Sequence, residues 1–169
     1  MQVILSKMDR RLYPLIAGML AAGCAHEGII QVGVLRPSNE DLLPSATVGA
    51  GYRGTNSNDV QAYATLDKDT RTDKNNRSIK TDNLSLRFGV GKRFGKGNSR
   101  HTFSGNVLVR QENFDQDPVD MFGVGVGYMH SSMSARKDEK SFNSGIRLEA
   151  VMGNPDIDSI LSLYAGVGF

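Results

Sequence analysis

The chain has 169 residues and a net charge of +2, a size that fits a single domain and a charge too small to indicate nucleic-acid binding. Hydrophobic residues make up 39 % of the chain and the mean hydropathy is −0.32, which excludes a bundle of membrane-spanning helices. Glycine is abundant, with 19 residues, and few segments have the periodicity of a helix, so we expect extended structure.

Residues 1–23 are predicted to be a signal peptide. A positively charged stretch, 7–11, precedes an apolar stretch, 12–22, that is too short to cross a bilayer as a helix. Met8 is an alternative start that would leave a compact charged region before the same apolar stretch. This order of charged and apolar residues is typical of exported proteins.

The signal peptide leads into a short motif, Leu20-Ala21-Ala22-Gly23-Cys24. The motif resembles a lipobox, the site at which bacteria attach lipid to a new N-terminal cysteine. The resemblance implies that Cys24 carries a lipid anchor and that the mature chain is 24–169. Cys24 is the only cysteine, so an internal disulfide is excluded. Cleavage after Ala25 is the alternative, and it would discard Cys24 with the signal peptide.

The rest of the chain contains eight segments in which apolar and polar residues alternate, the pattern of β-strands. Several of them have the 9 to 11 residues that a tilted strand needs to cross a bilayer. We therefore predict an all-β fold, an eight-stranded antiparallel β-barrel in the transmembrane form. The segments are 29–36, 44–53, 59–67, 82–94, 101–112, 119–130, 141–152 and 159–169.

The two faces of these segments differ consistently. One face is apolar, and the other carries charged residues, polar residues and most of the glycines. A soluble barrel of the lipocalin type would turn the apolar face inward, whereas a membrane barrel would turn it to lipid and close the charged face around its lumen. Glycine weakens a strand and packs against nothing on a solvent face, but inside a narrow barrel it makes room for large side chains. This favours the membrane barrel.

The connections and aromatic residues fit the same arrangement. If both termini are periplasmic, the polar stretches 67–82 and 113–120 are extracellular loops, and 53–59 and 95–100 are short periplasmic turns. An aromatic band then lies near the periplasmic ends of the strands, on the apolar face, as such barrels require. Its members are Tyr52, Phe94, Phe103, Tyr128, Phe142 and Phe169.

Charged residues on the inward face form the most distinctive group in the sequence. Charges removed from water need partners, so we predict a structural salt-bridge network that fills the lumen; a gated or leaky pore is the alternative. Pairing Arg147 directly with Tyr164 across the last two strands would stack the ring on the guanidinium. The predicted network consists of Arg87, Arg93, Arg110, Glu112, Arg147, Glu149 and Tyr164, with Asp67 as a further candidate.

The last segment alternates up to the final residue, Phe169. An alternating strand that ends on an aromatic residue resembles the last strand of bacterial outer-membrane barrels, which the insertion machinery recognises. In strand number, strand length and alternation, the mature chain resembles the OmpA transmembrane domain and the OmpX/Ail group. The resemblance implies a Gram-negative outer membrane, contact with its lipid and lipopolysaccharide, and a non-enzymatic structural or interaction role, with an envelope protein as a further partner.

His130 and Ser132 form an H-x-S motif on the apolar face. The motif resembles part of the active site of the lipid A deacylase PagL, which makes a lipid-modifying enzyme an alternative function. Ser144 occupies the position where that family has Glu, and the strand directions place His130 on the periplasmic side. A lipid-anchored periplasmic binding barrel of the lipocalin type is a third possibility. The sequence predicts neither a cofactor nor a metal site, since the remaining histidines are isolated from other ligands.

Overall fold

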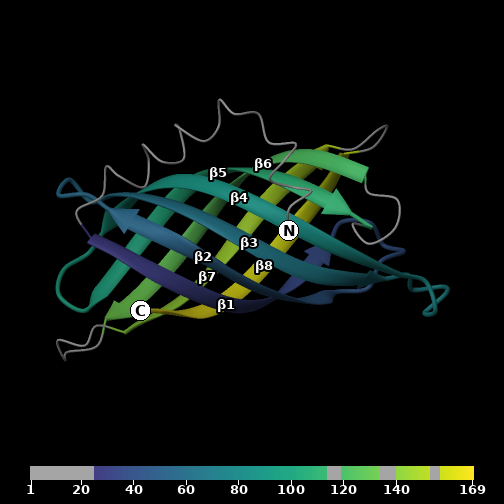
Figure 1. Ribbon diagram of the computed structural model, residues 1–169, viewed down its shortest axis with the longest axis horizontal. Coiled ribbons are helices and arrows are strands. Elements are labelled where there is room, and N and C mark those ends of the chain that lie inside the picture. The colour runs from purple at the N-terminus through teal and green to yellow at the C-terminus, as the bar shows by residue number, and fades with distance from the viewer. Residues whose placement is uncertain (1–24, 114–118, 134–139, 153–156) are drawn as a thin grey trace.

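The computed structural model describes residues 25–113, 119–133, 140–152 and 157–169. These residues form a closed barrel in which each strand pairs antiparallel with the next and β8 pairs with β1 (Figure 1). The strands are β1 (Ala25–Pro37), β2 (Ser45–Thr55), β3 (Val60–Thr72), β4 (Lys80–Phe94), β5 (Ser99–Glu112), β6 (Val119–Met133), β7 (Ser141–Met152) and β8 (Ile157–Gly168). The described part of the chain has no helix long and apolar enough to cross a membrane.

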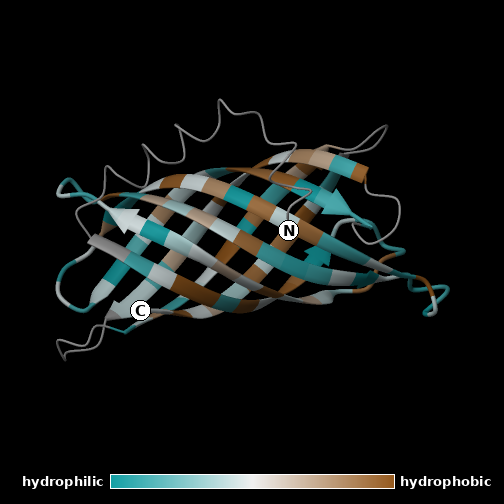
Figure 2. Ribbon diagram, viewed as in Figure 1, coloured by the Kyte–Doolittle hydropathy of each residue, from teal (hydrophilic) through white to brown (hydrophobic). Residues whose placement is uncertain are grey.

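The alternation along each strand sorts the side chains between the two surfaces of the wall. Apolar residues point outward, and Val126 and Phe142 are 63 % and 68 % exposed. Charged residues point inward, and Arg110 and Glu149 are fully buried. Figure 2 shows the result as hydrophobic and hydrophilic patches that alternate along the strands. The predicted eight-stranded barrel is confirmed, and its apolar face is the outer one.

The two ends of the barrel differ in their connections. We call the end where β1 begins and β8 finishes the terminal end, and the opposite end the distal end. The β2–β3 and β4–β5 turns at the terminal end are tight, with positive φ angles at Asp59 and Gly95. At the distal end, the β3–β4 hairpin projects beyond its neighbours (Figure 1). The β1–β2 connection is tied to this hairpin by a bridge between Leu42 and Asp73.

The polar stretch 67–82 is not the loop that the sequence predicted. β3 continues to Thr72 and β4 starts at Lys80, so only 73–79 connect them. Alternation in hydropathy is lost here because both faces are polar. The inward Asp67, Asp69 and Arg71 are buried among charged partners, and the outward Lys68 lies 3.3 Å from Asp82.

The inner face also contains an apolar cluster that the sequence analysis did not anticipate. Leu35, Leu108, Val151 and Ile160 are all buried inside the barrel, and Met121 packs against them. The cluster brings together β1, β5, β7 and β8 near the distal end. In the sequence, inward apolar residues look the same as outward ones. Only the strand register shows which of them face the lumen and which face outward.

Candidate functional site

The centre of the lumen is organised around Arg87 on β4. Its guanidinium donates to both carboxylate oxygens of Glu149 on β7, from Nε to Oε1 at 2.7 Å and from Nη2 to Oε2 at 2.9 Å. Nη1 of the same guanidinium donates to Asp67 on β3. Asn106 on β5 adds a further hydrogen bond to Glu149. A bidentate pair of this kind is the strongest geometry that arginine and a carboxylate can adopt.

Arg147 on β7 completes the central cluster from the other side. Its Nη1 lies 3.5 Å from Oδ2 of Asp67, and its Nη2 donates to Gln31 on β1 at 2.8 Å. Gln31 in turn donates to Asp67 at 2.6 Å. The guanidinium carbon lies 4.0 Å from the centre of the Tyr164 ring, so the predicted stacking is present.

The strand register behind this stacking differs from the one the sequence suggested. Tyr164 lies opposite Gly145, and Arg147 lies opposite Ser162. The ring therefore reaches Arg147 diagonally across the pair of strands. A Cβ added to Gly145 would lie 2.5 Å from the Tyr164 ring, so the glycine makes room for the ring to lean over. This close approach explains why a residue without a side chain faces the tyrosine.

A second charged cluster lies nearer the distal end. Arg110 on β5 donates to both oxygens of Asp69 on β3, at 2.8 and 3.0 Å, and its Nε donates to Glu112 at 3.2 Å. Arg71 lies 2.8 Å from Glu112 and 3.4 Å from Asp158 on β8. The predicted residues Arg110 and Glu112 are thus brought together here, separately from Arg87, Arg147 and Glu149 in the central cluster.

A third cluster, near the terminal end, was missed by the sequence analysis. Arg53 on β2 donates to Glu27 on β1 and, at 3.1 Å, to Asn143 on β7. Ser141 donates to the same Glu27 oxygen at 2.6 Å. Arg53 was the last residue of the predicted strand 44–53 and the first of the predicted turn 53–59, and Glu27 lay outside the predicted first strand. Correct strand ends would have placed both on the inward face.

Arg93 does not belong to any of these clusters, although its position in the alternating pattern of the strand predicted that it would point into the lumen. It lies at the terminal rim, its side chain is 25 % exposed, and it donates to Oδ1 of Asp59 at 2.8 and 3.0 Å. The hydrogen bond from Arg93 lowers the pKa of the Asp59 carboxyl from its usual value of 3.8. The strand reaches the end of the barrel at this point, so an inward direction no longer leads into the lumen.

The lumen is filled by these side chains. Two cavities between the described inward side chains have volumes of about 20 and 10 Å³, which is room for roughly one water molecule each. Glycines give the charged groups space: a Cβ at Gly49 would lie 1.7 Å from Asp67, and one at Gly125 would lie 2.7 Å from Glu149. Among the described residues, the apolar face of the wall is the outer one, which is the reverse of the arrangement that a lipocalin-type barrel requires.

The outer wall carries a separate group of polar aromatic residues on β5 and β6. His130 Nε2 lies 3.0 Å from Ser99 Oγ, and His101 Nδ1 lies 2.8 Å from the hydroxyl of Tyr128. The His101 and His130 rings lie 5.0 Å apart. Ser132 is exposed and faces Ser99 across the strand pair. The structure therefore gives His130 a different serine partner from the one in the H-x-S motif. Among the described residues, no cluster of metal-ligating side chains is present.

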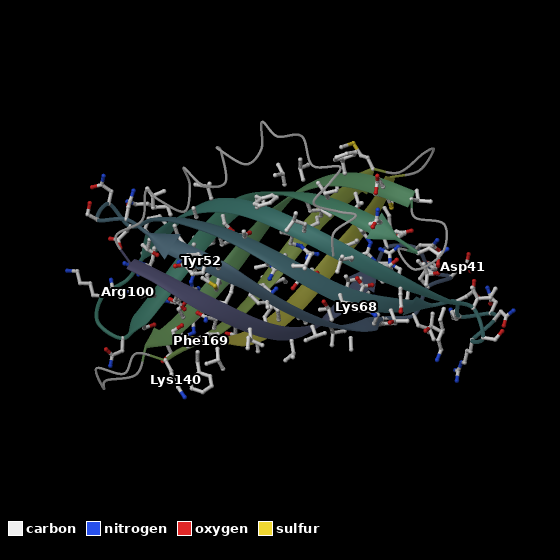
Figure 3. The ribbon with its side chains drawn as sticks, in the orientation of Figure 1. Asp41, Tyr52, Lys68, Arg100, Lys140 and Phe169 are labelled. Carbon is white, nitrogen blue, oxygen red and sulfur yellow. The ribbon has the colours of Figure 1, made fainter. Side chains whose placement is uncertain are left out.

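The terminal end also carries exposed aromatic side chains. Figure 3 shows Tyr52 and Phe169 at this end, with Asp41 and Lys68 toward the other. The backbone of Phe169 exchanges two hydrogen bonds of 2.9 Å with Gly28, so the last residue completes the seam between β8 and β1. Cys24 lies outside the described residues, as does the predicted signal peptide, 1–23.

Solved structures with the same fold are outer-membrane barrels. Neisserial surface protein A superposes with a TM-score of 0.58 at 14 % identity, covering 85 % of this chain and 95 % of its own. Ail of Yersinia pestis gives 0.53 at 13 % identity, with coverages of 85 % and 97 %. The outer membrane enzyme PagL gives 0.53 at 12 % identity, with coverages of 82 % and 97 %. No family model and no curated protein sequence matches the chain.

Proposed function

We propose that this chain spans the outer membrane of a Gram-negative bacterium as a non-enzymatic, non-conducting barrel, with a structural or interaction role in the envelope. One observation carries the proposal: the wall is apolar outside and charged inside. In water, the exposed outer face would be a hydrophobic surface far larger than soluble proteins tolerate. In a bilayer the same face meets lipid, and the closed sheet leaves no unpaired strand edge.

The ends of the barrel support an orientation with both termini in the periplasm. Two of the three connections at the terminal end are short turns, 56–59 and 95–98, and this end carries exposed aromatic residues, as the inner rim of such barrels does. The projecting β3–β4 hairpin would then lie outside the cell. Its exposed Lys74, Arg77 and Lys80 suit contact with lipopolysaccharide phosphates or an envelope protein. Phe169, directly after the closing strand β8, is the proposed signal for the insertion machinery.

Lipid attachment at Cys24 is part of the proposal. β1 starts at Ala25, so an anchored Cys24 would place its acyl chains beside the terminal end of the barrel. Since the barrel itself would hold the protein in the membrane, the anchor would serve to position the N-terminus against a partner. Labelled palmitate should enter the wild-type chain and not a Cys24→Ala variant. Equal recovery of partners by both proteins would refute the positioning role.

The membrane location is tested by gel migration of the Cys24→Ala protein. We expect the variant to require detergent for extraction and to migrate differently before and after boiling, because a hydrogen-bonded barrel resists unfolding in detergent. A variant that is freely soluble without detergent would refute the membrane location. Planar-bilayer recordings test the closed lumen separately.

A second candidate function is hydrolysis of a lipid ester on the outer wall. The hydrogen bond between Ser99 and His130 favours it, because a serine nucleophile needs an adjacent base. The test compares the phospholipid and lipid A composition of cells that overproduce the wild-type chain or a Ser99→Ala variant, with Ser132→Ala as the control. Ser99-dependent loss of acyl chains would establish the enzyme, whereas unchanged lipids would support the non-enzymatic role.

A further inference from the structure

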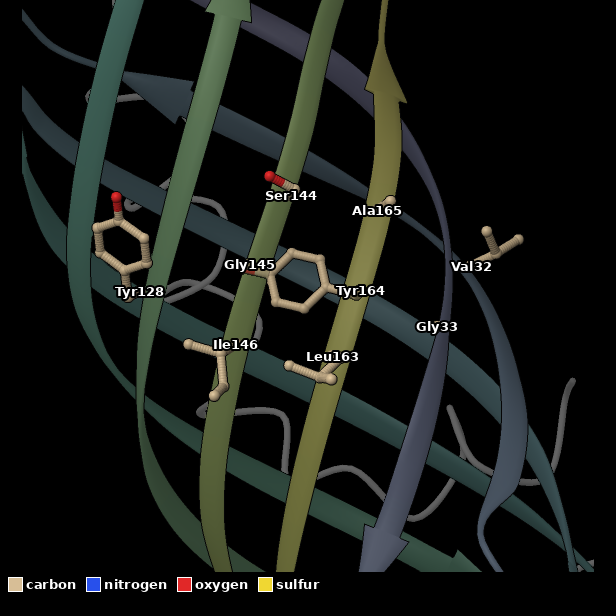
Figure 4. Close-up of a pocket in the computed structure, with 9 residues that line it drawn as sticks. All are labelled: Val32, Gly33, Tyr128, Ser144, Gly145, Ile146, Leu163, Tyr164 and Ala165. Atoms are coloured by element: carbon tan, nitrogen blue, oxygen red, sulfur yellow. The ribbon is translucent and has the colours of Figure 1, made fainter.

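The outer wall is hollowed over β7, β8 and β1. A cavity of about 650 Å³ there has Ser144, Ala165 and Val32 across its width (Figure 4). Ser144 lies opposite Ala165 in the β7–β8 pair, and Ala165 lies opposite Val32 in the β8–β1 pair. These outward residues therefore form one row across three strands, and two of the three have very small side chains.

Larger residues border this row on both sides. Toward the distal end, Ile146 lies opposite Leu163, and toward the terminal end, Phe142 lies opposite Val167. Leu163 and Phe142 are exposed, so both rows stand out from the wall. The hollow is thus a product of sequence: small residues stand in one row of outward positions and bulky residues in the rows above and below it.

A second cavity, of about 620 Å³, extends the hollow to the terminal end along the seam between β8 and β1. It shares Val32 and Ala165 with the first cavity. Its remaining side-chain walls are apolar except at the terminal end, where Lys140 lies beside Phe169, as Figure 3 also shows. Lys140 is exposed and is the charged residue among those lining the groove.

We propose that this groove binds one acyl chain of an anionic glycerophospholipid and that Lys140 binds its phosphate. The inference rests on the proposed membrane location, which puts the groove in the periplasmic half of the bilayer. A flexible acyl chain that lies in an open apolar groove gains contacts with its floor and its borders, whereas a chain on a smooth wall has contacts on one side. The ammonium group at the mouth of the groove matches a phosphate at the membrane interface.

A second copy of the chain is a poorer occupant of the same surface. A two-fold dimer would place this face against itself, and a self-complementary interface needs a ridge to meet each hollow. Here the small residues of the two copies would face each other across a void. Lipopolysaccharide is also disfavoured, because its phosphates lie at the other surface of the membrane in the proposed orientation.

The test uses the full chain in bilayers that contain spin-labelled phosphatidylglycerol or spin-labelled phosphatidylcholine. Electron paramagnetic resonance measures the fraction of label immobilised by the protein. We expect phosphatidylglycerol to be preferred, and expect Lys140→Gln to reduce that preference about fivefold, the effect of one basic residue near anionic lipid. Lys96→Gln, in the exposed β4–β5 turn at the same end, is the matched control and should have no effect.

Filling the groove tests the acyl-chain part of the proposal. Ala165→Leu should lower the immobilised fraction of both lipids, and Ala64→Leu, on the outer wall of β3, should not. Boiled and unboiled gel migration checks that every variant is folded in the membrane. If the wild-type chain shows no difference in migration between boiled and unboiled samples, the proposed membrane location is refuted. If that difference is present while Ala165→Leu and Lys140→Gln behave like their controls, or if Ala165→Leu instead dissolves a dimer, the lipid groove is refuted and the membrane location stands.

Discussion

Glu149→Gln is the substitution that tests the interior network most directly. Glu149 is fully buried and accepts hydrogen bonds from Nε and Nη2 of Arg87 and from Asn106. Glutamine has the same shape, but it has no charge and offers an NH₂ group where an acceptor is needed. Breaking a buried ion pair from one side costs about 3 to 5 kcal/mol. Arg87 keeps Asp67, so we expect a loss of about 3 kcal/mol, roughly a hundredfold in the folding equilibrium.

The loss can be measured by equilibrium urea unfolding in detergent micelles. The chain has no tryptophan, so the folded fraction should be followed by gel migration and circular dichroism. Glu112→Gln is the matched control: this carboxylate also contacts two arginines, but its side chain is 25 % exposed, and we expect a loss of no more than about 1 kcal/mol. Equal losses for the two variants would refute the view that desolvated charge pairs hold the centre of the barrel.

Three further predictions concern the interior and the rim. Gly49→Ala should destabilise the barrel by about 1 to 3 kcal/mol in the same unfolding assay, because its Cβ would displace Asp67. Gly105→Ala should be nearly neutral, because its Cβ would meet only the backbone oxygen of Gly125, at 4.0 Å. The Asp59–Arg93 pair should stabilise the fold at pH values above 3.8 and lose this effect as the pH falls through the lowered pKa of the folded state; Asp59→Asn should remove that pH dependence, and a profile identical to wild type would contradict it. In planar bilayers the wild-type chain should give no discrete conductance steps, and regular single-channel openings would show that the filled lumen can open.

The strand number, the closed barrel and the polarity of its two faces could be predicted because they depend on a period of two, which is local in sequence. The stretch 67–82 could not, because the inward Asp69 and Arg71 gain their ion-pair partners only after β5 and β8 are in place. The inward Leu35 and Ile160 were missed for a related reason: apolar residues on both faces hide the alternation.

Within the predicted network, the residue types were informative and the pairings were not. Parity placed Arg87 and Glu149 on the inward face, but nothing local indicates that they form a bidentate pair across the lumen. For Arg93 the alternation of odd and even positions gave the wrong result. The alternation predicts whether a side chain points inward, but it does not predict how far along the barrel axis the residue lies. The contact between Arg147 and Tyr164 depends on a diagonal step past Gly145, which a register guessed from sequence does not provide.

Several polar contacts of the interior join strands that are far apart in the chain, although Arg87 also pairs with Asp67 on the neighbouring β3. Arg87 is 62 positions from Glu149, and Arg147 is 116 positions from its partner Gln31. A nascent β3–β4 hairpin entering lipid would carry Arg87 with Asp67 but without Glu149, and a buried charge network that is only partly paired is unfavourable. Association of β1 with β8 and the withdrawal of these side chains from water are therefore expected to occur together. Assembly of this barrel should proceed as one concerted step, since partly inserted intermediates would neutralise only part of the charge on their inner surface.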